Sequence, residues 1–441
     1  MKKSIQRFSF AAGALSLPLS QPVLADFFED SQAMLGLRNF YFNNDFRNRA
    51  GSAGQSKTEE WVQGFMLNFS SGYTEGSLGV GLDAIGLVGL TLDSGAGRHR
   101  GSSMIPRDGE GAADEWSRLG LTPKLKFSKT EARYGTLMPK LPVVTYNDGR
   151  LLPQTFEGGQ ITSNELDELT LTAGRLEHAT GRASSDRTGL AVMGGTQESN
   201  EFLLAGADYR FSPELTAQYY FGNLEDYYKQ HFLGLVHSFP IAEGQSFKTE
   251  LRYFKTASDG ANSSASGRAS GYKVSGFSEE GTGEIDNRTW SAAFTYAIGG
   301  HALTAGYQRV SDGSNFVQLN QGSLPGKGAG GASLYLHTDR MLASFNRAGE
   351  RTGFAQYNYD FAAAGIPGLK ASVIYLKGDN IQSYSGNEKS EWERDIALDY
   401  VIQGGAFKGL GIGWKNGLLH SEVDPNQEQN RLILSYSFAL F

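Results

Sequence analysis

The chain has 441 residues, of which 57 are Gly and none is Cys, and aromatic side chains make up 12% of it. The lack of Cys excludes a disulfide framework, a thiol nucleophile and thiolate metal ligands. The formal net charge is −7, from 40 basic and 47 acidic side chains without a long basic run, so a nucleic-acid partner is not expected.

The N-terminus has the pattern of a bacterial secretory signal peptide. Basic residues up to Arg7 precede an apolar stretch over 8–19, and a cleavage site follows at Val23-Leu24-Ala25. We therefore expect residues 1–25 to be a signal peptide and 26–441 to form a single exported unit. An N-terminal membrane anchor is the alternative, but the apolar run is too short to span a bilayer.

The rest of the chain repeats an alternation of apolar and polar residues. In 33–42, Leu35, Leu37 and Tyr41 share one parity, whereas Arg38 takes the other. Similar segments recur to the C-terminus, among them "LTAQYYFGN", "RTWSAAFTYAIGG" and "LKASVIYLKGD". A period near two in segments of about ten residues is typical of the strands of membrane β-barrels.

The connections between these segments alternate in length. Tight turns at 211–215, 298–302 and 361–368 alternate with long polar loops, which cover 93–119, 256–286, 312–349 and 379–390. Short turns at one rim and long loops at the other predict an all-β fold, a transmembrane antiparallel β-barrel. Such a barrel pairs every backbone polar group and leaves a polar lumen, which is consistent with the low mean hydropathy of −0.35.

The last segment, 431–441, is expected to close the barrel. Leu434 and Phe438 would face lipid, while Ser435 and Ser437 would face the lumen. The terminal aromatic, Phe441, is similar to the signal that the barrel assembly machinery reads, although a sandwich strand that ends in Phe by chance is the alternative. Sixteen or seventeen strands can be recognised, and because single-chain barrels need an even number, 178–198 is expected to hide another.

Basic residues recur on the lumen parity of the predicted strands. Arg133 is assigned inward because Ala132 and Tyr134 alternate with Glu131 and Arg133, and an outward arginine costs roughly 2–4 kcal/mol at the bilayer midplane. Guanidinium groups in a narrow aqueous pore can hold a carboxylate. The candidates for substrate binding in the strands are Arg38, Arg133, Arg252, Lys415 and Arg431. The alternative is that they only balance acidic residues of the lumen.

Residues 139–165 form an unusually apolar loop with three Pro and an Asn-Asp-Gly turn. Apolar residues are unexpected in a solvent-exposed loop, so we expect this one to fold into the barrel and constrict the channel. Tyr146, Asp148 and Arg150 then become candidate constriction residues. The alternative is an external loop.

No motif indicates catalysis, a cofactor or a metal. The glycine-rich "GKGAGG" at 326–331 lies in a long loop and not between a strand and a helix, as a dinucleotide site requires. The seven His residues are scattered, and no metal site or cofactor is expected. Glu391, Glu393 and Asp395 alternate on one strand and are interpreted as a solvated lumen face, so no enzyme is expected.

Several stretches resemble one known family. They include "DFFEDSQAMLGLRNFYFNNDFR", "EARYGTLMPKLPVVTYNDGRLLPQTFEG" and "LTAGRL", and the likeness extends from Asp26 to Phe441. The chain resembles the OprD-type porins, which are outer-membrane carboxylate channels of pseudomonads. The resemblance implies 18 strands, an inward-folded third loop and a ladder of lumen Arg and Lys residues. Arg38 and Arg133 match, as does Arg175 of "AGRL", although strand parity does not clearly place Arg175 in the lumen.

We therefore expect an outer-membrane porin for the passive uptake of small carboxylate-bearing solutes, such as amino acids or aromatic acids. Its expected partners are anionic or zwitterionic solutes, outer-membrane lipid and lipopolysaccharide. A general diffusion porin without a binding site is the alternative. A barrel-embedded hydrolase would need a nucleophile and base at the barrel surface or outer rim, and no recognisable motif supplies them.

Overall fold

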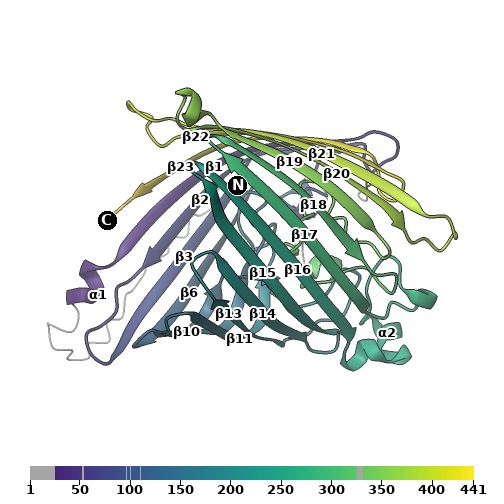
Figure 1. The fold of residues 1–441 in the computed structure, drawn as a ribbon, viewed down its shortest axis with the longest axis horizontal. Coiled ribbons are helices and arrows are strands. Elements are labelled where there is room, and N and C mark those ends of the chain that lie inside the picture. Colours follow the sequence, from purple (N-terminus) through teal and green to yellow (C-terminus); the bar gives the residue numbers. More distant parts are fainter. Residues whose placement is uncertain (1–24, 52–53, 96, 100, 110, 325–330) are drawn as a thin grey trace, which may run out of the picture.

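The computed structural model describes residues 25–51, 54–95, 97–99, 101–109, 111–324 and 331–441. Within these ranges, eighteen long strands form one antiparallel sheet that closes on itself (Figure 1). They are β1 (Gln32–Phe46), β2 (Lys57–Ser70), β3 (Leu78–Asp93), β6 (Glu115–Phe127), β7 (Thr130–Leu137), β10 (Thr155–Leu166), β11 (Leu169–Thr180), β13 (Phe202–Arg210), β14 (Leu215–Leu224), β15 (Tyr228–Ala242), β16 (Gln245–Ser258), β17 (Asp286–Ile298), β18 (His301–Val310), β19 (Arg351–Asp360), β20 (Leu369–Ile381), β21 (Lys389–Val401), β22 (Gly411–Ser421) and β23 (Gln427–Ala439).

The barrel closes between the first and the last strand. β1 and β23 pair from Met34↔Ala439 to Phe46↔Gln427, so the sheet has no free edge there. The predicted barrel with 18 strands is confirmed. The expected signal peptide lies outside the described residues except for Ala25, which begins helix α1 (Ala25–Glu29).

The strand missing from the sequence-based count is β10, and it does not lie in 178–198. That segment holds the end of β11, the two-residue strand β12 (Arg187–Thr188) and an isolated bridge, Leu190↔Ser199. β10 lies instead within the range assigned to the constriction loop. The predicted loop 139–165 is therefore too long at its C-terminal side, because Thr155–Leu166 pair with both β7 and β11 as part of the wall.

Side chains alternate between the outside and the lumen along each strand. On β23, Leu432 and Leu434 are 44% and 37% exposed on the outer face, whereas Arg431 on the other parity is only 8% exposed. Ser435 and Ser437 line lumen cavities. On β23 the lipid-facing row is thus apolar and the lumen-facing row mostly polar, as expected for an integral membrane barrel.

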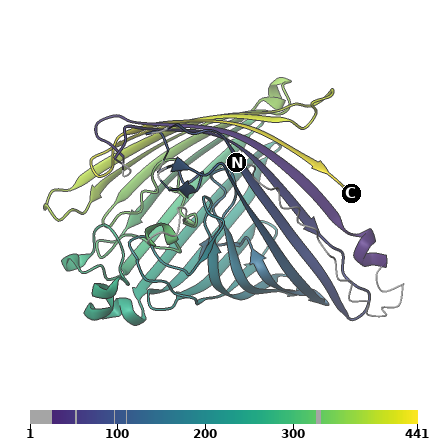
Figure 2. The ribbon, with the colours of Figure 1, turned by 180° about the vertical axis from the view of Figure 1, so that it is seen from behind.

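The two ends of the barrel differ. Short turns such as 128–129, 167–168 and 299–300 lie at one end, together with α1 and the C-terminus, and the longer connections lie at the other, with α2 (Ala265–Ser270) (Figures 1 and 2). In outer-membrane barrels the short turns are periplasmic and the long loops extracellular. None of the helices in the described ranges has the length and apolar character needed to cross a membrane.

Two loops fold into the barrel and pack against each other. They are 138–154 between β7 and β10, termed L3, and the described residues 311–324 and 331–350 between β18 and β19, termed L7. The Ser333 N–H donates to the Thr145 carbonyl at 3.0 Å, and the Gln318 amide donates to the Pro142 carbonyl at 2.7 Å. Apolar side chains of both loops join one buried cluster, which includes Val143, Val144, Phe316, Val317 and Leu319.

L7 also explains three carboxylates on the lumen face of β21. Glu393 accepts hydrogen bonds from the backbone N–H groups of Leu342 and Ala343 at 2.9 and 2.8 Å, and Asp395 accepts one from Met341. Glu391 is buried beside Arg347 at 3.6 Å. The prediction that these groups point inward is correct, but all three contact L7, and Glu391 and Glu393 are buried and not solvated.

Candidate functional site

L3 packs closely against the inner wall of the barrel because glycines of the wall leave room for its side chains. Leu151 packs so closely on Gly64 of β2 that a Cβ there would stand 3.0 Å from the Leu151 side chain. Gly222 of β14 faces Val143 in the same way, with a Cβ distance of 3.1 Å. Leu151 and Val143 are fully buried. Their burial in the lumen accounts for the apolar composition of the loop.

Arg38 of β1 holds the tip of this loop. Its guanidinium contacts both carboxylate oxygens of Asp148, at 2.8 and 3.2 Å, and donates to the carbonyls of Arg150 and Leu151 at 2.8 and 3.1 Å. Asp148 keeps 41% of its side chain exposed. The loop tip is therefore fixed to the wall by a bidentate ion pair, while a carboxylate edge remains open to the lumen.

Four of the predicted cations converge here. A cavity of about 330 Å³ is lined by Arg38, Arg150, Lys415 and Arg431, together with Asp148 and Asp399. Arg431 donates to the Met341 carbonyl of L7 at 3.0 Å, and Arg150 donates to the Ser102 carbonyl at 2.6 Å. Both loops and the extracellular loop 94–114 thus meet at one group of cations, which we term the cation cluster (Arg38, Arg150, Lys415 and Arg431).

Positive charges around L3 repel one another. Burial, and then repulsion from the charges of Arg431 and Arg182, lower the pKa of the Arg150 guanidinium well below its ordinary value. Arg182 itself donates to the Asn147 side chain of L3 at 3.0 Å. A field that opposes a further positive charge at Arg150 favours an anion in the adjoining cavity.

Tyr146 lies on the other side of the Arg38–Asp148 pair. It lines a second cavity, of about 290 Å³, with Met34, Ser437 and both members of that pair. Arg38 and Asp148 therefore form part of the wall of both cavities. The residues predicted from the loop, Tyr146, Asp148 and Arg150, are brought together with Arg38.

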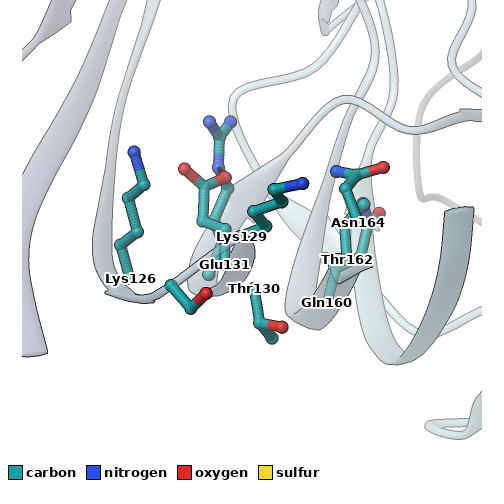
Figure 3. A pocket seen from close by; sticks show the side chains of 9 residues that line it. Lys126, Lys129, Thr130, Glu131, Gln160, Thr162 and Asn164 are labelled. Carbon is teal, nitrogen blue, oxygen red and sulfur yellow. Dashed lines mark hydrogen bonds and ion pairs between the residues drawn. The ribbon is translucent and has the colours of Figure 1, made fainter. Parts of the chain in front are cut away.

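Two predicted cations lie elsewhere in the lumen. Arg252 stacks 4.1 Å from the ring centroid of Tyr335 and donates to the Tyr335 carbonyl, so it anchors L7. Arg133 lies near the periplasmic mouth, in a cavity of about 610 Å³ that Figure 3 shows with Lys126 and Glu131 extending in the same direction from neighbouring strands. Arg133 pairs with Glu131 and lies 3.8 Å from Asp83.

The structure contradicts a lumen position for Arg175. On β11 it shares its parity with Leu171, which is 46% exposed, and it lies directly across from Leu203, which is 40% exposed. It pairs with Glu201 at 3.2 Å on the outer face. Arg175 is therefore excluded from the lumen ladder, since its parity opposes that of the buried Leu176.

Arg118 was not identified from the sequence; it contacts the C-terminal end of β11 and the C-terminal end of L3. Its guanidinium donates to the carbonyls of Pro153, Thr180 and Gly181 at 2.6, 3.2 and 2.9 Å. Because residues up to 119 are predicted as an extracellular loop, the parity of β6 is not read there. The alternation of Trp116, Arg118 and Thr122 with Leu119 and Leu121 is the available signal.

A closed barrel with an apolar outer face, a polar lumen and two inward loops defines an outer-membrane channel. The chain belongs to the OprD family: the family model described as "outer membrane porin, OprD family" matches residues 25–440. It is therefore a substrate-specific channel of the bacterial outer membrane and not an enzyme.

Individual relatives agree with this assignment. The chain is 34% identical to the porin-like protein GalP of Pseudomonas putida over 97% of this chain and 96% of that protein. The crystal structure of Pseudomonas aeruginosa OccK8 (OprE) superposes with a TM-score of 0.86 and 50% identity, covering 95% of this chain and all of that one. The structure of Pseudomonas aeruginosa OpdK with vanillate gives a TM-score of 0.81 and 35% identity over 94% of this chain and all of that one.

Replacing Arg133 with Ala is expected to shift ion selectivity toward cations. The substitution leaves Glu131 without its nearest cation at the periplasmic mouth, where Arg133 is 43% exposed and accessible to permeating ions. The measurement is the reversal potential in a salt gradient across a planar bilayer. An unchanged reversal potential would show that this arginine does not contribute to selectivity.

Proposed function

We propose that the channel selects small solutes that carry a carboxylate and lets them diffuse passively past L3. The observation that carries this proposal is the convergence of Arg38, Arg150, Lys415 and Arg431 on one cavity of about 330 Å³. Guanidinium and ammonium groups replace part of the hydration of a carboxylate through charge-assisted hydrogen bonds. Binding stays weak enough for release because the same cations are partly engaged by Asp148 and by backbone carbonyls.

Lys415 is the cation of this cluster best placed to meet a solute. Arg38 is held by L3, Arg150 by the Ser102 carbonyl and Arg431 by L7. Lys415, in contrast, lines the cavity from β22 without a hydrogen bond or ion pair to any described residue. The vanillate of the OpdK structure is an aromatic carboxylate, which supports the same class of solute for this chain.

We expect benzoate to reduce the ion current of the channel in a saturable way, while benzamide, which has the same ring and no charge, does not. Lys415→Gln should raise the half-saturating benzoate concentration by about tenfold, since a charge-assisted hydrogen bond is worth roughly 1.5–3 kcal/mol. The measurement is single-channel recording with increasing benzoate.

Lys126→Gln is the matched control. Lys126 is also a lumen lysine, but it lies at the periplasmic end of β6 in the cavity of Arg133, which shares no lining residue with the cavity of the cation cluster. A current that falls in proportion to benzoate without saturation, or an equal effect of the two substitutions, would favour a general diffusion porin.

We also infer two contacts of the outer surface. Phe441 is 69% exposed, and its carbonyl accepts a hydrogen bond from Ala33 N–H at 3.1 Å, so the terminal aromatic is available to the barrel assembly machinery at the closing strand. The exposed apolar side chains around the barrel would contact outer-membrane lipid, including the acyl chains of lipopolysaccharide.

A further inference from the structure

The wall is incomplete beside β6. The ladder between β6 and β7 ends at Lys124↔Arg133, and β7 stops at Leu137, where the chain turns into the lumen as L3. The Thr122 hydroxyl donates to the Thr136 carbonyl at 2.7 Å, a side-chain bond that takes the place of the next ladder bond. Above it, residues 115–121 of β6 pair with β3 only, among the described residues. This edge of β6 lies in the extracellular half of the wall.

A cavity of about 270 Å³ occupies the gap. Its lining includes side chains of lumen parity, among them Ile85, Leu87 and Arg118, and side chains of outward parity from both borders of the gap, namely Ser117, Leu119, Thr136 and Glu157. The cavity is therefore lined by side chains from both faces of the sheet, on the two sides of the gap.

Arg118 crosses the gap on its lumen side. Its bonds to Thr180 and Gly181 tie β6 to the end of β11, and its bond to Pro153 ties β6 to the end of L3. Its Nε is buried and has no hydrogen-bond partner among the described residues. A single side chain thus replaces the ladder that this stretch of wall lacks.

The outer border of the gap is polar. Ser117, Thr136 and Glu157 take outward positions, and Arg187 donates to Glu157 at 2.8 Å, with 64% and 36% of these two side chains exposed. Hydrocarbon satisfies neither an unpaired strand edge nor a carboxylate, so this border requires water. Leu119 beside it is 77% exposed and offers an apolar surface.

We propose that the gap is a water-filled side window, latched by Arg118, through which amphipathic carboxylates dissolved in the outer leaflet enter the lumen beside L3. The headgroup would meet Arg187 and then Arg118, and the tail would lie along Leu119. The choice of solute rests on the proposed carboxylate selectivity, whereas the window itself rests only on the geometry of the wall.

Cysteine labelling tests the window directly, because the natural chain has no Cys. Ser117→Cys is compared with Val88→Cys, since Val88 lies directly across the ladder from Ser117 on the same outer face and is 38% exposed. In proteoliposomes, 2-sulfonatoethyl methanethiosulfonate should modify the Ser117→Cys thiol at least about tenfold faster than the Val88→Cys thiol, because hydrocarbon excludes the charged reagent. Arg118→Met should raise the rate in the Ser117→Cys variant further.

Labelling of both variants after denaturation controls for the reactivity of the thiols. Equal rates in the two folded barrels would overturn the window. This result does not depend on carboxylate selectivity, which the benzoate titration tests separately, so the two proposals can fail independently.

The solute class is tested by protection of the same thiol. Decanoate should slow the modification of the Ser117→Cys variant several-fold, whereas decyltrimethylammonium, which has the same chain and the opposite charge, should not. Absence of protection by decanoate, or equal protection by both amphiphiles, would overturn the assignment of the window to carboxylates.

Discussion

Deletion of Tyr146–Pro153 is expected to raise the single-channel conductance by about twofold or more, because pore diameter limits ion flow at the narrowest point. The segment carries Asp148 and Arg150 and fills the lumen beside Arg38. The remaining residues can still join β7 to β10, since Leu137 and Phe156 already face each other in the ladder. The deletion also removes the buried Leu151 and Leu152, so some loss of stability is expected.

A deletion of the same kind in an exposed loop is the control. Ser385–Asn387 lie in the extracellular connection between β20 and β21, and all three are exposed. Their removal should leave the conductance unchanged. Heat-modifiable mobility in gels identifies folded barrels in both variants, and unchanged conductance of a folded L3 deletion would mean that L3 does not limit the current.

The wall of the barrel could be predicted from the sequence because lipid imposes a strict rule on it. Outward residues of β1 and β23 face hydrocarbon, whereas inward residues face the lumen or the loops folded into it, so parity assigns Arg38 inward and Leu434 outward correctly. β10 is not recognised in the sequence because its side chains do not alternate regularly between apolar and polar. Gly158 and Gly159 carry no side chain to reveal a face, and a register shift at Glu157/Gly158 displaces the alternation.

The interior was harder to predict, because it depends on contacts between distant segments. The apolar residues of L3 predict that it folds inward, but the length and polarity of 312–349 give no sign that L7 does the same. Its anchors, such as Glu393 on β21 and Arg252 on β16, look like ordinary lumen charges in the sequence.

In the candidate site, too, single residues could be predicted from the sequence, whereas contacts between distant segments could not. Arg38 and Asp148 can each be identified from the sequence, but their pairing across 110 positions cannot. Arg175 matches a motif, and its parity overrules the motif. Arg118 is missed because its strand reads as a loop, although it links two strands of the wall and L3.

Leu434→Lys is expected to destabilise the folded barrel by about 2–4 kcal/mol, the cost of a lysine on the lipid face near the midplane. Leu434 lies in the middle of the outward row of β23, directly across from Asn39 and Ile412 on its neighbours. The measurement is equilibrium unfolding in urea with heat-modifiable mobility as the readout.

Ser437→Lys is a better lumen control than a lysine at Ser435. Ser435 lies directly across from Arg38, so a lysine there would add repulsion within the cation cluster, whereas Ser437 faces Gly36 and lines the cavity that holds Asp148. A lysine at 437 remains in water near a carboxylate and should cost less than about 1 kcal/mol. An equal loss of stability in both variants would contradict the assigned parity of β23, and with it the lumen positions of Arg431 and, through the pairing of the strands, Arg38 and Lys415.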